Sequence, residues 1–299
     1  MVLTNFYTRA IFGILYAAVV VGGIMSGPMG LLLLVLSIVF FCWKEWLALH
    51  KTPLLMQWAI GLFTAFLFLP FLVSNEAIHE NLHRQFPALL CILGLSLMLF
   101  GIVFQGIAFM NTAKLWAIGS LFISLPLFLF LQLPQAMEGH NAAVFSYVSW
   151  QFDMPHDTLG HVQDYSFKYP LLVFLLIWSS DTLAYIVGRS LGKNPLHSEL
   201  SPKKTWEGFF GGCLLTGFLA SFLFAYFELG TGVSGFIFGA LVSVFGTVGD
   251  LFESSIKREL GIKESGRFLP GHGGALDRFD SFLFGSLLTW AWFSLCGKL

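Results

Sequence analysis

The sequence predicts an all-α, polytopic integral membrane protein with about nine transmembrane helices and a cytoplasmic N-terminus. Three observations lead to this class. Of the 299 residues, 56% are hydrophobic and only 11% are charged, whereas soluble domains carry about 25% charged residues. Apolar runs close to the ~20 residues that cross a bilayer recur along the whole chain. The basic residues are also distributed unequally between the segments that join these runs.

The apolar runs can be drawn as nine helices. In chain order they are Ala10 to Met25, Met29 to Trp43, Leu54 to Val73, Pro87 to Met110, Leu115 to Leu133, Tyr169 to Val187, Phe209 to Phe227, Gly232 to Leu251 and Ser281 to Cys296. The first two are short and are separated only by Ser26-Gly-Pro28. They are therefore either two spans or one kinked or re-entrant pair, and the count carries an uncertainty of one or two.

The distribution of basic residues supports this count and orients the chain. When connecting segments are assigned alternately to the two sides, only Arg84, Lys168 and Lys298 of the 16 Lys and Arg residues fall on the second side. Cytoplasmic loops are the basic ones, so the N-terminus is predicted inside and the C-terminus outside. The net charge of -1 argues against a nucleic-acid partner. We expect one membrane domain, 1–299, in which 1–168 supplies N-terminal helices and an outer loop, and 169–299 carries the polar clusters.

The polar cluster nearest the C-terminus, Gly249 to Asp280, interleaves basic and acidic residues in an otherwise apolar chain. Membrane proteins carry ionisable groups mainly where function requires them. Asp250, Ser254 and Lys257 or Arg258 recur at spacings of three or four, which places carboxylate, hydroxyl and cation on one helix face. Such a mixture suits a polyphosphate bound beside a divalent cation.

The end of the same cluster combines glycines with two further acids. The glycines of Pro270-Gly-His-Gly-Gly274 permit the backbone conformations of an anion-binding nest. Asp277 and Asp280 follow, one helical turn apart. Two carboxylates from separate segments, Asp250 and Asp277, suit a hard cation such as Mg²⁺. The alternative is a salt-bridged surface loop.

Two more clusters precede this one. Asp181 and Tyr185 share a face of the sixth predicted helix, either as site residues or as a helix-packing hydrogen bond. In the loop 188–208, Ser201-Pro202 is predicted to open a helix whose first turn offers Lys203 and Lys204 to phosphate oxygens. A basic cytoplasmic loop demanded by topology alone is the alternative.

These residues resemble a known family, the phosphatidate cytidylyltransferases, also called CDP-diglyceride synthases. The resemblance rests on three blocks, which are Asp181-Thr-Leu-Ala-Tyr185, Ser201-Pro-Lys-Lys-Thr-Trp-Glu-Gly208, and Ser254-Ser-Ile-Lys-Arg258 with Leu269-Pro-Gly-His-Gly-Gly274 and Asp277-Arg-Phe-Asp280. Residues 1–170 match only in being hydrophobic. Glu264 stands where the family usually has Asp, and Ala275 where a larger aliphatic residue is usual, so a metal contact at 264 is in doubt and the change at 275 should affect only packing.

The resemblance implies transfer of a cytidylyl group from CTP to phosphatidate, with Mg²⁺ and a possible second cation such as K⁺ as cofactors. It implies catalytic roles for Asp250, Asp277, Lys257, Arg258 and His272, with Asp250, Asp277 and Asp280 as metal ligands. It implies substrate binding by Asp181, Ser201, Lys203, Lys204, Ser254, Lys263, Gly273, Gly274 and Arg278. His272 is either a proton donor to pyrophosphate or a structural residue of the glycine loop. We expect a bacterial cytoplasmic (inner) membrane, an active site facing the cytoplasm and a homodimer.

Two other functions remain as alternatives. An ion-coupled transporter would also carry intramembrane acids, but here the ionisable residues gather near one membrane face and spare the midplane. Another membrane CDP-lipid transferase, such as a CDP-alcohol phosphotransferase, would need a run of spaced aspartates after a DG and AR pair, which this sequence lacks.

Overall fold

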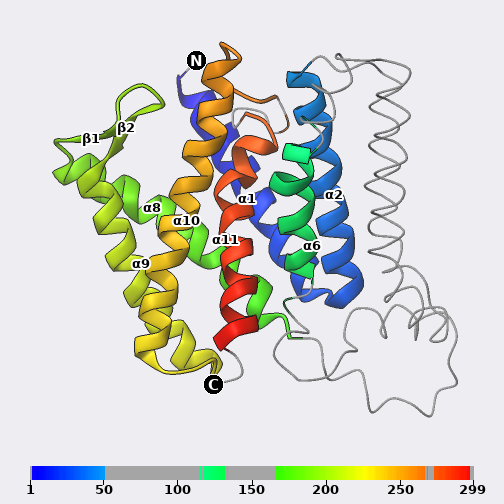
Figure 1. Ribbon diagram of the computed structural model, residues 1–299, viewed down its shortest axis with the longest axis vertical. Helices are drawn as coiled ribbons and strands as arrows, with labels where there is room; N and C mark the ends of the chain where they lie inside the picture. The colour runs from blue at the N-terminus through cyan, green and yellow to red at the C-terminus, as the bar shows by residue number, and fades with distance from the viewer. Residues whose placement is uncertain are drawn as a thin grey trace, which may run out of the picture.

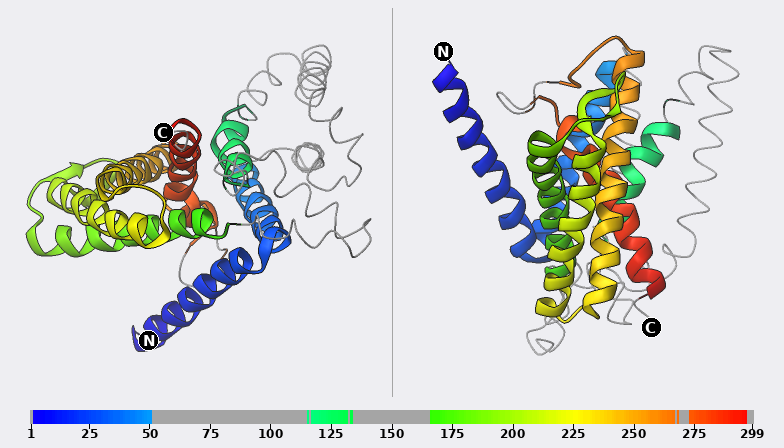
Figure 2. Two further views of the ribbon diagram at one scale, coloured as in Figure 1. Left: turned by 90° about the horizontal axis from the view of Figure 1, so that it is seen from below. Right: turned by 90° about the vertical axis from the view of Figure 1, so that its left-hand side faces the viewer.

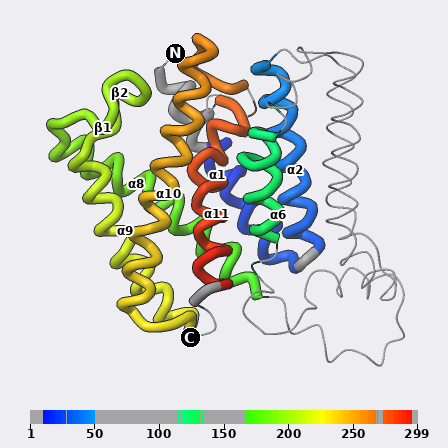
Figure 3. The backbone as a smooth tube through the Cα atoms, in the orientation of Figure 1, coloured from blue at the N-terminus to red at the C-terminus, as the bar shows by residue number. Residues whose placement is uncertain are grey.

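The computed structural model describes residues 2–50, 115, 117–131, 133, 166–266, 268 and 273–296. Nearly all of these residues lie in helices that run along one axis of the molecule (Figure 1). Helices α8, α9, α10 and α11 form a bundle, and α2 and α6 flank it on the α11 side (Figures 1 and 3). Helix α1 is inclined to the others and leads away from them (Figure 2). The predicted helical membrane protein is confirmed in this coarse form.

The first two helices are longer than the sequence predicts and meet at a sharp turn. Helix α1 spans Val2–Met25 and α2 spans Gly27–Leu49. Gly27 has a φ of 86°, a left-handed conformation that glycine adopts without strain. The Ser26 hydroxyl donates to the Gly22 carbonyl at 2.6 Å and satisfies part of the exposed end of α1. The two segments are therefore separate helices joined by a one-residue turn.

Within the described residues, four helices have the length and composition to cross a membrane. They are Met29–Leu49 within α2, α8 (Lys168–Leu191), α9 (Trp206–Phe227) and α10 (Gly232–Glu259). Ile11–Met25 and Ala117–Leu131 are shorter apolar helices, the second of which contains the π-helical turn η2 (Ser120–Ser124) and α6 (Leu125–Leu131). The last predicted span forms α11 (Leu276–Cys296). The predicted spans at 54–73 and 87–110 lie outside the described residues.

The bundle packs closely because glycines let its helices approach each other and aromatic rings fill the space between them. A Cβ on Gly212 would lie 2.9 Å from the Ala184 Cβ, so α9 approaches α8 at a distance that only glycine permits. Phe174 of α8 stacks on Phe282 of α11 with ring centroids 4.2 Å apart, and Phe130 of α6 packs edge-on against both. These three rings are fully or almost fully buried and fix α8 and α11 relative to each other.

A short hairpin between α8 and α9 departs from the predicted all-α fold. Strand β1 (Pro195–His197) pairs antiparallel with β2 (Ser201–Thr205) at one end of the bundle (Figure 1). The predicted helix start at Ser201-Pro202 is wrong, because α9 begins only at Trp206. Thr205 is extended and its hydroxyl caps α9 by accepting from Gly208 N at 3.1 Å. The lysines at 203 and 204 therefore lie on a strand.

Candidate active site

A cavity of about 870 Å³ opens where the hairpin meets α8, α10 and α11. Figure 1 shows the hairpin, the end of α10 and the start of α11 at the same end of the bundle, and residues of all three elements line the cavity. Eight of the predicted site residues line it. They are Asp181, Ser201, Lys203, Lys204, Asp250, Asp277, Arg278 and Asp280.

Three carboxylates of the cavity come from three different helices. Asp181 lies on α8, Asp250 on α10 and Asp280 on α11. Asp280 is 7% exposed and lies close enough to Asp250 and Asp181 for their negative charges to act on it. Like charges held together in this way repel unless a cation joins them. The cavity therefore favours a positively charged ligand or group among these acids.

Lysine and arginine side chains face the same carboxylates. Lys204 of β2 forms an ion pair with Asp250, although β2 and α10 are far apart in sequence. Lys203 and Arg278 also line the cavity and are exposed to it. The hairpin thus contributes two lysines to the cavity and α11 contributes Arg278, opposite carboxylates of α8, α10 and α11. A ligand that carries phosphates and a cation would meet complementary charges in both sets of side chains.

Arg189 is a cavity residue that the sequence reasoning missed. It lies in the last turn of α8 and its Nη1 donates to the Tyr185 hydroxyl at 3.1 Å. Asp181, Tyr185 and Arg189 follow one another at intervals of four residues, and all three line the cavity. This spacing was visible in the sequence and predicts the shared face. The predicted pairing of Asp181 and Tyr185 on one face is confirmed.

Asp277 is held by three hydrogen bonds from two segments. Its Oδ1 accepts from Lys257 Nζ at 2.6 Å, and its Oδ2 accepts from Gly274 N at 2.8 Å and Ser265 N at 3.0 Å. Asp277 precedes the apolar part of α11. Burial alone would raise its pKa, but these hydrogen bonds outweigh burial and hold the pKa below its ordinary value. Asp277 therefore stays ionised and closes the loop before α11.

In the described part of the glycine loop, a backbone N–H donates to a carboxylate of the protein itself. Gly273 has a φ of 85°, which turns the backbone so that the next N–H, that of Gly274, points at Asp277. A Cβ on Gly273 would lie 2.9 Å from Asp277 Oδ2. The predicted anion-binding nest thus has a carboxylate beside it, supplied from within the chain. The predicted role of His272 lies outside the described residues.

Three predicted residues of α10 do not line the cavity. Lys257 is buried and pairs with Asp277 and with Glu253, one turn before it on α10. Ser254 is also buried. Arg258 points elsewhere, since its Nη1 donates to the Ile262 carbonyl at 3.0 Å and closes the turn after α10. The structure thus separates Lys257 from Arg258, which the sequence had treated as interchangeable.

Lys263 and Glu264 are exposed and do not line the cavity. Ala275 is fully buried, in agreement with its predicted packing role. Glu45, on α2, was not predicted at all. Its Oε2 accepts from Ser265 Oγ and from Leu276 N, so a residue of the N-terminal half contacts the site.

Carboxylates are suitable ligands for a hard cation, but those of the described residues do not converge on one metal position. Carboxylate oxygens are the ligands that Mg²⁺ prefers, together with substrate phosphates and water. Among the residues that the structure describes, no three Asp, Glu, His or Cys side chains converge on a common metal position. Asp250 is paired with Lys204, and both oxygens of Asp277 accept hydrogen bonds. Asp250 and Asp280 would need least rearrangement to bind a metal, because neither is held by as many donors as Asp277.

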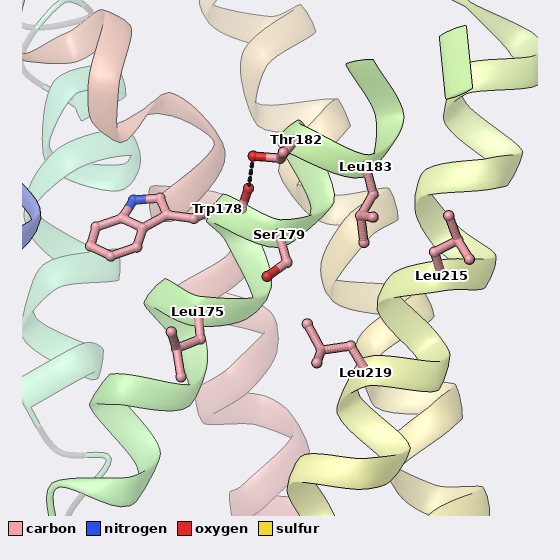
Figure 4. A pocket seen from close by; sticks show the side chains of 7 residues that line it. All are labelled: Leu175, Trp178, Ser179, Thr182, Leu183, Leu215 and Leu219. Atoms are coloured by element: carbon pink, nitrogen blue, oxygen red, sulfur yellow. Dashed lines mark hydrogen bonds between the residues drawn. The ribbon is translucent and has the colours of Figure 1, made fainter. Parts of the chain in front are cut away.

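A separate apolar groove of about 530 Å³ lies between α8 and α9. Leu183 and Ser179 of α8 lie on one side of it, and Leu215 and Leu219 of α9 on the other (Figure 4). The Thr182 hydroxyl donates to the Trp178 carbonyl at 2.8 Å, so the helix itself satisfies this polar group. The groove therefore presents mainly hydrocarbon to an occupant.

A bundle with helices of membrane-crossing length, a charged cavity at one end and an apolar groove between two of its helices defines a helical membrane protein. The chain belongs to the cytidylyltransferase family, whose sequence pattern matches residues 7–296. The predicted family is confirmed.

Curated relatives carry the name phosphatidate cytidylyltransferase. The protein from Staphylococcus saprophyticus is 50% identical over 118 residues, that from Staphylococcus epidermidis 48% over 118, and that from Staphylococcus aureus 48% over 120. Each match covers 39% of this chain and 45% of the relative. Less than half the length of these relatives is therefore matched.

Proposed function

We propose that this protein transfers the cytidylyl group of CTP to phosphatidate, giving CDP-diacylglycerol and pyrophosphate. One observation carries the proposal, namely that residues of α8 and α9 line both a cavity with basic and acidic side chains and an apolar groove. CTP is wholly polar, whereas phosphatidate has a phosphate head and two acyl chains. The names of the relatives support the same reaction.

The reaction joins two anions, so charge neutralisation is the main task of the protein. An oxygen of the phosphatidate phosphate attacks the α-phosphorus of CTP, and the bond from that phosphorus to the pyrophosphate oxygen breaks. The attacking oxygen is already anionic and needs no general base. Positioning and electrostatic stabilisation therefore supply the catalysis. Lys203, Lys204, Arg189 and Arg278 are the cavity residues that would bind the phosphate oxygens.

We propose Mg²⁺ as the cofactor, held by Asp250 and Asp280 with Asp277 beside them. When bound there, the ion would neutralise part of the triphosphate charge. Lys204 would then leave Asp250 and turn to a phosphate oxygen, because the lysine and the metal ion would compete for the Asp250 carboxylate. A second cation such as K⁺ remains a proposal from the family resemblance.

The groove is proposed to hold one acyl chain of phosphatidate. Because α8 and α9 run antiparallel, their contacts proceed from Gly188 with Gly208, through Ala184 with Gly212, to the groove residues Leu183 and Leu215. The first of these contacts borders the cavity and the last borders the groove. A lipid whose phosphate lies among the cavity cations would therefore extend a chain along this seam.

Topology and location follow from the sequence as further proposals. We propose nine spans with the N-terminus in the cytoplasm, an active site that faces the cytoplasm, and a bacterial inner membrane as the host. The clustering of charged residues at one end of the bundle supports an active site near one membrane face. A single domain and a homodimer are kept as proposals on the same footing.

A radiochemical assay tests the function directly. The purified protein in detergent, given CTP labelled at the α-phosphate, phosphatidate and Mg²⁺, is expected to move label into the organic phase. Label on the γ-phosphate should remain in the aqueous phase as pyrophosphate. No transfer of α-label under any Mg²⁺ concentration, with a well-dispersed protein, would refute the proposal.

A further inference from the structure

We propose that Glu45 of α2 is a positioning residue for the active site, holding the segment from Ser265 to Leu276 so that Asp277 and Arg278 face the cavity. The kinetic part of this inference rests on the proposed function. The structural part does not, because it concerns only how a loop is fixed. Glu45 lies outside the charged clusters that the sequence analysis identified.

Glu45 holds the segment at both of its ends. Its Oε2 accepts from Ser265 Oγ at 2.9 Å and from Leu276 N at 3.0 Å. Leu276 is the first residue of α11, and the first N–H groups of a helix have no partner within the helix. A carboxylate beside a helix N-terminus also interacts favourably with the helix dipole. Glu45 therefore caps α11 from a distant part of the chain.

Asp277 holds the same segment from the other side. Ser265 donates its hydroxyl to Glu45 and its backbone N–H to Asp277. Gly274 donates its N–H to Asp277 as well. Loss of Glu45 would remove one of the two carboxylates that keep this loop closed. Among the described residues of the loop, the hydrogen bonds to Asp277 and the Phe41–Phe268 ring contact would remain.

Two glycines of the loop leave room for the Glu45 side chain. A Cβ on Gly266 would collide with Glu45 Oε1, and a Cβ on Gly274 would collide with Glu45 Oε2 and Ser265 Oγ. The close approach of backbone to carboxylate explains why these positions lack side chains. An acid more than two hundred residues earlier in the sequence thus accounts for part of the glycine pattern.

Helix α2 also contacts the loop through an apolar side chain, in addition to the hydrogen bonds of Glu45. Phe41, one turn before Glu45, lies with its ring centroid 4.5 Å from that of Phe268. The same face of α2 therefore contacts the loop through a ring and a carboxylate. Because this ring contact would persist without Glu45, a Glu45 variant should keep the fold and lose only the exact placement of Leu276 and the residues after it.

The test combines backbone exchange with kinetics. Glu45→Ala removes the oxygen that accepts both hydrogen bonds, Glu45→Gln keeps one amide oxygen as an acceptor, and Lys44→Ala changes an exposed neighbour on the same helix. Hydrogen–deuterium exchange of peptides covering 265–277 is measured in full-length protein in detergent. In Glu45→Ala we expect faster exchange there, and kcat lower by roughly ten- to a hundredfold with KM for CTP within about twofold, since small displacements of reacting groups cost up to about a hundredfold. Glu45→Gln should stay within about threefold of wild type, because its oxygen still accepts hydrogen bonds.

Each outcome has a defined meaning. Unchanged exchange at 265–277 in Glu45→Ala would overturn the inference, whatever the kinetics show. Equal losses in Glu45→Gln and Glu45→Ala would also overturn it, since the hydrogen bonds would not be the cause. If Glu45→Ala fails to fold, Ser265→Ala, which removes only the hydroxyl donor, must give the same pattern at smaller amplitude. A wild-type protein without cytidylyl transfer would refute the proposed function, while the exchange data would still decide the role of Glu45.

Discussion

Lys257 of α10 donates from Nζ to Oδ1 of Asp277 on α11 at 2.6 Å, within a pair of side chains that are each no more than 10% exposed. The same ammonium group pairs with Glu253 one helical turn before it. One buried cation thus joins two carboxylates and ties the end of α10 to the start of α11. Because Asp277 also holds the glycine loop, this pair links helix packing to the shape of the cavity.

Lys257→Met is expected to destabilise the protein by about 3 to 5 kcal/mol, the cost of leaving a buried charge without its partner. Two carboxylates, Glu253 and Asp277, would lose their common cation. Thermal unfolding in detergent measures the effect. Arg258→Met is the matched control, because this neighbouring cation is exposed and donates to the carbonyl of Ile262 in the turn after α10. Equal stability of the two variants would contradict a structural role for Lys257.

Asp250→Asn is expected to lose Mg²⁺-dependent turnover by at least about a hundredfold, the scale of removing one preorganised charge from an active site. The variant should still insert and purify, because Asp250 is only partly buried. Glu199→Gln, an exposed acid in the turn between β1 and β2, removes the same charge away from the cavity lining and should keep full activity. Wild-type turnover in both Asp250→Asn and Asp280→Asn would refute the metal assignment.

Lys204→Ala is expected to raise KM for CTP about tenfold, or ~1.4 kcal/mol, because it removes a charged donor to phosphate. The Mg²⁺ concentration for half-maximal activity should stay the same or fall, since Asp250 loses a competing partner. Initial rates over a grid of CTP and Mg²⁺ concentrations separate the two effects. Lys193→Ala, an exposed lysine before β1, is the control. A large rise in the Mg²⁺ requirement with unchanged KM would be the contrary result.

Hydrophobic runs predicted the helices of the described residues well, because lipid leaves a chain few other solutions. Every predicted span within the described residues is helical, although the ends differ. Helix α2 runs on to Leu49 and α10 to Glu259, past the apolar residues, since helices continue until a cap or a turn stops them. The hairpin escaped prediction because Pro202 suits both the first turn of a helix and a short edge strand. The Thr205 hydroxyl caps α9, so the helix begins after it and Pro202 lies in a strand.

The cavity was predicted in part because its residues are charged residues in an apolar chain. Asp181, Lys204, Asp250 and Arg278 stand out for that reason and do line one cavity. Spacing along a helix could not tell Lys257 from Arg258, since both lie within a turn of Ser254 and only the packing of α11 selects one. Glu45 gave no local signal, because its partners are backbone and hydroxyl groups brought to it by the fold.

Leu215→Trp is expected to discriminate between substrates by chain length, because an indole ring would fill the groove between α8 and α9. KM for a phosphatidate with long acyl chains should rise about tenfold, equivalent to the loss of roughly two buried methylene groups at ~0.8 kcal/mol each. A dioctanoyl phosphatidate, whose chains are too short to fill the seam, should change little, and KM for CTP should not change. Leu214→Trp adds the same ring at the neighbouring position, which does not line the groove, and serves as the control. If Leu215→Trp affected both lipids equally, or if Leu214→Trp behaved identically, the acyl chain would have to lie elsewhere.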